Sequence, residues 1–126
     1  MKQEKIYTQH SENNEWMNNV AFYQGEIKFM GERLQEIASK NTAKEVLKQV
    51  EHFQNQFIIH EERLDELKHE INVSNDSLNK EIEKNSTALD HRKVKDHTIA
   101  REEMKSFEKT FTSMKADFYT FLSKWM

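Results

Sequence analysis

The sequence predicts an all-α protein that forms an antiparallel, up-down-up-down four-helix bundle. The chain of 126 residues holds two glycines and no proline, although sheets and loop-rich folds need these residues at their turns. Hydrophobic residues make up 36% and charged residues 33%, a balance typical of long helices that each bury one apolar stripe. Several segments also space their apolar residues alternately by three and four, as helices of a left-handed bundle do.

Residues 1–10 are expected to be a flexible N-terminal lead-in, because they offer only Ile6 and Tyr7 as apolar anchors. A single bundle domain is predicted to cover residues 11–126. Its first helix is predicted over about 12–40, with Ser11 as the N-cap residue. The apolar stripe of this helix consists of Trp16, Val20, Tyr23, Ile27, Met30, Leu34 and Ile37.

The second helix, predicted over about 43–72, carries the longest stripe in the chain. Its members are Val46, Val50, Phe53, Phe57, His60, Leu64, Leu67 and Ile71. A short connection at 39–42 requires this helix to lie antiparallel to the first. Residues 72–77 are rich in Asn, Asp and Ser, which favour turns, so they are predicted to end the second helix.

The last part of the chain carries two stripes whose registers do not join. Leu78, Ile82, Asn85 and Leu89 predict a third helix over about 76–93. A fourth helix is predicted over about 98–125 from Met104, Phe107, Phe111, Met114, Phe118, Phe121 and Trp125. We favour a polar connection at 95–98, since a continuous helix would put Arg92 and Asp96 at core positions. The alternative is a bundle of three long helices, the third passing through this region.

One core position holds a polar residue, His60. In an antiparallel pair of helices it lies level with Tyr23 of the first stripe, and an imidazole–phenol hydrogen bond would satisfy both groups. We favour this structural role. The alternative function is a ligand- or metal-binding bundle with a polar core site around His60 and Tyr23, because histidine is the side chain most easily switched near neutral pH.

The sequence favours a protein that is not an enzyme and has no metal or cofactor. There is no cysteine to act as a nucleophile and no Gly-rich phosphate loop. A single Glu-x-x-His motif occurs, and its Glu66 and His69 flank the core residue Leu67 and so point to solvent. With a net charge of −3 and no basic run beyond residues 91–95, nucleic-acid binding is not expected.

The location and the partners are predicted from the distribution of apolar residues. No apolar segment resembles a signal peptide or reaches the ~18 residues of a membrane span, so a cytoplasmic protein is expected. The C-terminal segment holds more apolar residues than one stripe buries, with Tyr119, Leu122 and Met126 beside the stripe. We therefore expect a small helical bundle that acts through protein–protein contacts, as a homodimer or an adaptor, with these three residues at the contact.

Overall fold

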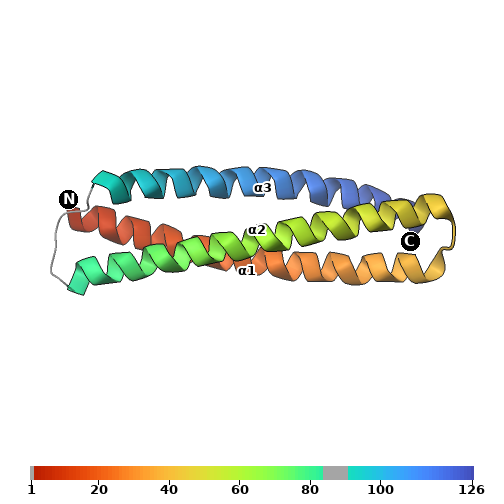
Figure 1. The fold of residues 1–126 in the computed structure, drawn as a ribbon, viewed down its shortest axis with the longest axis horizontal. Helices are drawn as coiled ribbons and strands as arrows, with labels where there is room; N and C mark the ends of the chain where they lie inside the picture. Colours follow the sequence, from red (N-terminus) through yellow and green to blue (C-terminus); the bar gives the residue numbers. More distant parts are fainter. Residues whose placement is uncertain (1, 84–90) are drawn as a thin grey trace.

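The computed structural model describes the backbone of residues 2–83 and 91–126 and the side chains of residues 6–81, 83 and 96–126. Within these residues the chain forms three α-helices, α1 (Lys2–Lys40), α2 (Lys44–Glu83) and α3 (His91–Trp125). Figure 1 shows α1 and α3 running in the same direction, with α2 antiparallel to both. The all-α prediction is confirmed. The number of helices in the described residues does not confirm the four-helix bundle and agrees with the three-helix alternative.

The predicted apolar stripes meet in one core. Phe53 of α2 packs its ring against Phe118 and Phe121 of α3, with ring centroids 5.3 and 5.1 Å apart. Each helix contributes side chains that are 1% exposed or less, namely Val20, Ile27, Met30, Leu34 and Ile37; Val46, Leu64 and Leu78; and Phe111 and Phe118. The three-four spacing therefore identified the buried side of every helix.

The first helix ends at Lys40, as predicted, but it begins at Lys2 rather than near residue 12. Ser11 thus lies inside α1 and is not its N-cap. The predicted lead-in is helical from Lys2 onward, and the core stripe continues through it, since Ile6, Gln9 and Asn13 are buried. At the other end, Asn41 Nδ2 donates a hydrogen bond of 2.8 Å to the Ile37 carbonyl and closes the helix before the short connection to α2.

The predicted break at 72–77 is wrong, because α2 continues to Glu83 and buries Leu78. The polar residues in this segment find partners on a neighbouring helix. Asn13 Nδ2 donates hydrogen bonds to Ser74 Oγ at 3.1 Å and to Asn75 Oδ1 at 3.0 Å. These cross-helix bonds satisfy side chains that would otherwise favour a turn, so the helix persists.

The predicted connection at 95–98 is also wrong, since these residues belong to α3. The register that starts at Met104 extends backward to His97, which is buried, while Asp96 is exposed. The core position is therefore occupied by His97, which has stacking and hydrogen-bond partners, and not by Asp96. The predicted stripe positions Asn85 and Leu89, and the side chains of the basic run 91–95, lie outside the described residues.

The continuity of α2 can be tested with a proline at residue 76. Asp76 is exposed, so Asp76→Pro changes mainly the backbone. A proline inside a helix removes a hydrogen bond and clashes with the preceding turn, so we expect the free energy of unfolding to fall by about 3 kcal/mol or more. Chemical denaturation measures this change. Asp76→Ala is the matched control, expected within about 0.5 kcal/mol of the wild type. A proline variant as stable as this control would contradict a continuous α2 and support the predicted turn at residues 72–77.

Candidate functional site

The buried polar side chains concentrate at one end of the bundle. Gln9, Asn13 and His97 are buried there, and Ser74 lies beside Asn13. We call this end, where α1 and α3 begin and α2 finishes, the polar end. Sequence reasoning missed it because polar residues at core positions were interpreted as turns or lead-ins. The available signal was the unbroken three-four spacing that these residues share with their apolar neighbours.

A cavity of about 460 Å³ lies at the polar end. In Figure 1, α2 and α3 diverge towards this end of the bundle. All three helices contribute to its walls, with Gln9 from α1, Glu70, Ser74 and Leu78 from α2, and His97 and Glu103 from α3. This volume falls within the range of small-molecule sites in proteins.

His97 is held at the cavity wall by three neighbours. Its ring stacks on Trp16 with centroids 4.9 Å apart and an interplanar angle of 23°. Its Nε2 lies 3.2 Å from Glu12 Oε1, and Arg101 donates two further hydrogen bonds to the same carboxylate, at 2.6 and 3.0 Å. Arg101 holds the pKa of Glu12 below its ordinary value of 4.5, so this carboxylate stays ionised at neutral pH.

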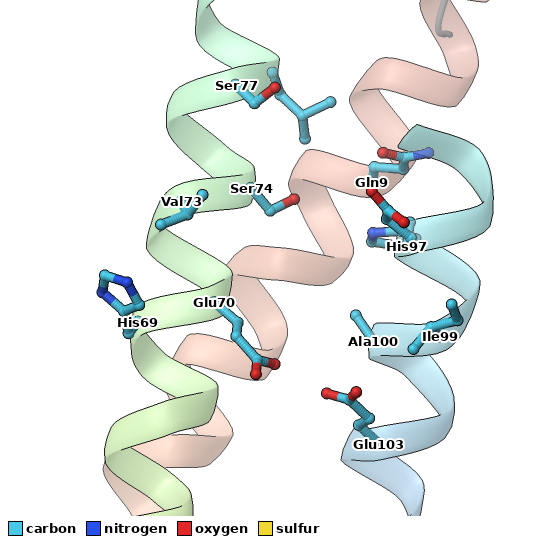
Figure 2. A pocket seen from close by; sticks show the side chains of 12 residues that line it. Gln9, His69, Glu70, Val73, Ser74, Ser77, His97, Ile99, Ala100 and Glu103 are labelled. Carbon is cyan, nitrogen blue, oxygen red and sulfur yellow. The ribbon is translucent and has the colours of Figure 1, made fainter. Parts of the chain in front are cut away.

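The other nitrogen of His97, Nδ1, is buried and has no hydrogen-bond partner. Burial lowers the pKa of His97 below its ordinary value of 6.5, although the Glu12 carboxylate acts in the opposite direction. The imidazole is therefore neutral at neutral pH, and because a carboxylate only accepts hydrogen bonds, Nε2 carries the proton. Nδ1 is consequently an unpartnered acceptor in a side chain that lines the cavity (Figure 2).

Two carboxylates face one another across the cavity. Figure 2 shows Glu70 of α2 and Glu103 of α3 pointing into the space between these helices. Burial and the nearby Glu103 carboxylate raise the pKa of Glu70. Arg63 lies beside both, 3.3 Å from Glu103 and 3.9 Å from Glu70, but it makes its shortest bond, 2.9 Å, to Glu66. One guanidinium is thus shared among three carboxylates.

The predicted pair His60 and Tyr23 lies away from the polar end, within the apolar core. His60 Nδ1 donates to the Gln56 carbonyl at 2.7 Å, and Nε2 has no hydrogen-bond partner. The predicted imidazole–phenol hydrogen bond is therefore wrong. Both rings pack against Phe111, at 6.0 Å from His60 and 4.6 Å from Tyr23. Neither residue lines the polar-end cavity.

Among the described residues we find neither a metal site nor a helix that could span a membrane. No three of their His, Asp or Glu side chains are arranged to hold a metal ion. Glu66 forms a hydrogen bond with Arg63, whereas His69 is exposed and belongs to the lining of the cavity. Over the same residues, none of the helices combines the length and the hydropathy that crossing a bilayer requires.

The predicted contact residues lie at the C-terminal end, Tyr119 and Leu122 in α3 and Met126 just after it. Tyr119 and Met126 are exposed, whereas Leu122 is half-buried and packs against the core. Phe22 and Phe29 of α1 are exposed as well. We call Phe22, Phe29, Tyr119 and Met126 the apolar face.

No protein-family model, curated protein or solved structure matches the chain.

The role of His60 can be tested by replacing it with leucine. Its Nε2 is buried without a partner, and the Gln56 carbonyl keeps its helical hydrogen bond when the imidazole is removed. We expect His60→Leu to raise the free energy of unfolding by about 1 to 3 kcal/mol in chemical denaturation. His52→Leu, at an exposed position of the same helix, should change it by less than about 0.5 kcal/mol. A destabilised His60→Leu protein would show that the imidazole has a partner in solution.

The environment of His97 predicts a pH dependence of stability. Because burial lowers its pKa in the folded state, the unfolded chain takes up the proton more readily. The free energy of unfolding should therefore fall as the pH drops below 6.5 and through the lowered pKa of His97. The Glu12 carboxylate and the Arg101 guanidinium that face it keep their charges over this range.

Denaturation between about pH 7.5 and about pH 5.5 measures this dependence. His97→Phe retains a ring to stack on Trp16 but cannot titrate, so its stability should change less over this interval. His52→Leu should keep the wild-type slope. Equal slopes for wild type and His97→Phe would contradict the prediction.

Proposed function

We propose that this protein is a non-catalytic helical bundle that acts through protein–protein contacts, and that it forms a homodimer through the apolar face. The observation that carries this proposal is the exposure of four large apolar side chains on α1 and at the C-terminal end of the chain. Phe22, Phe29 and Met126 are 60%, 49% and 59% exposed, and Tyr119 is 39% exposed. Single exposed apolar residues are common on monomers, whereas a group on one face is typical of an interaction site.

Polar contacts hold the apolar face together. Lys115 of α3 donates a hydrogen bond of 2.6 Å to Glu26 of α1, which ties the two helices at this level. The ammonium group of Lys115 also lies 5.9 Å from the centre of the Tyr119 ring, and the Arg33 guanidinium lies 5.2 Å from that of Phe29. Each cation lies over its ring, which favours one orientation of an exposed aromatic side chain.

The charges near the apolar face are largely paired within the chain. Arg33 binds Glu36 and Lys115 binds Glu26. The apolar side chains are therefore the part of this face that gains most from being covered, and a second copy of the chain presents the same apolar surface.

Analytical ultracentrifugation tests the dimer. We expect a mass of twice 15.2 kDa for the wild type, and 15.2 kDa for the variant that combines Phe29→Glu with Tyr119→Glu. Burying two new carboxylates without partners costs more than most interfaces can offset. Ile59→Glu provides the matched control, because Ile59 is 56% exposed on α2, away from this face. A monomeric wild type, or an Ile59→Glu variant that also dissociates, would refute the proposed interface.

A further inference from the structure

We propose that the polar-end cavity binds an aliphatic amine, with the ammonium group between Glu70 and Glu103 and the hydrocarbon chain along the apolar wall. This inference does not depend on the dimer, because the cavity lies between α2 and α3 and the apolar face lies on α1 and α3. It follows from three properties of the cavity, which are its hydrogen-bonding groups, its charge and its shape.

Three ionisable side chains of the cavity lining offer hydrogen-bond acceptors. His97 Nδ1 is an acceptor because Nε2 donates to Glu12, and it has no protein partner in a residue that is only 5% exposed. The Glu70 and Glu103 carboxylates, when ionised, also only accept. An ammonium group has three donors and no acceptor, so it is the common functional group that complements this arrangement.

The charge of the cavity also favours a cation. Among the described side chains that line it, Glu70, Asp96 and Glu103 are acidic and none is Lys or Arg. Arg63, from outside the lining, is divided among Glu66, Glu70 and Glu103 and neutralises this group only in part. Burial is the main cause that raises the pKa of Glu70, and the nearby Glu103 carboxyl group adds to it; a cation between these two groups opposes the contribution of Glu103.

The shape and the rest of the lining favour an organic cation over a metal ion. Val73, Leu78, Ile99 and Ala100 supply apolar wall beside the carboxylates, which suits methylene groups. A volume of about 460 Å³ is far larger than one ion requires. The described side chains also lack a set of three His, Asp or Glu arranged around one metal position. A calcium or magnesium ion would therefore leave most of the cavity unfilled. Water would also have to supply most of the ligands of that ion.

Isothermal titration calorimetry on the full chain, with hexylamine as the probe, tests the proposal. We expect saturable binding of one hexylamine per chain and none of 1-hexanol, which has the same chain without the charge. Calcium chloride distinguishes an inorganic cation site. If hexanol binds as well as hexylamine, the cavity is merely apolar; if calcium binds and hexylamine does not, it is a metal site. Either result, or no binding at all, overturns the proposal.

Two variants locate the binding. Glu103→Gln and Glu70→Gln each remove one charged acceptor and should each weaken hexylamine binding about tenfold, the effect of one charge-assisted hydrogen bond. Glu102→Gln is the matched control, since it removes the same charge from an exposed neighbouring position and should change affinity less than about twofold. Circular dichroism establishes that each variant is folded. If all three variants bind hexylamine equally, the attraction is non-specific and the assigned site is wrong.

Discussion

The structure depends on an unbroken core seam along each of three long helices. Such a seam requires a residue that tolerates burial at every third or fourth position, and at the polar end these positions hold Gln9, Asn13 and His97. Asn13 is satisfied by Ser74 and Asn75, and His97 by Glu12 at one nitrogen. Because these partners lie on other helices, the first turns of α1 and α3 and the last turns of α2 stabilise one another.

Ion pairs across the bundle fix the register of the helices, and the polar contacts between their ends require this register. Arg101 binds Glu12 and Lys115 binds Glu26, and both pairs join residues 89 positions apart in the sequence. Two contacts with the same separation, fourteen residues apart along each helix, hold α1 and α3 parallel without sliding. The Glu12 pair belongs to the polar end and the Glu26 pair to the apolar face. One alignment of α1 and α3 therefore positions both candidate sites.

The sequence predicted the helical class and the buried side of each helix, because apolar spacing is a local property that stripes such as Val46–Ile71 express on their own. It did not predict where α2 ends or where α3 begins. Ser74 favours a turn when considered locally, and only Asn13, sixty-one positions away, makes it a helical residue. The cavity was missed for the same reason, since Glu70 and Glu103 meet only when two helices are placed together. His60, in contrast, was correctly placed in the core, while its hydrogen-bond partner was not.

The two buried histidines differ in their surroundings. His60 and His97 each have one nitrogen bonded and one without a partner. The ring of His60 lies among Phe107 and Phe111, so its unpartnered nitrogen only lowers stability. His97 lines a cavity that also contains the Glu70 and Glu103 carboxylates. Leucine at position 97 would complete the seam at lower cost, yet it would remove a hydrogen-bond acceptor from the lining of the site that we propose. The polar residue at position 97 is thus explained by the proposed binding site, whereas Asn13 is explained by its hydrogen bonds to α2.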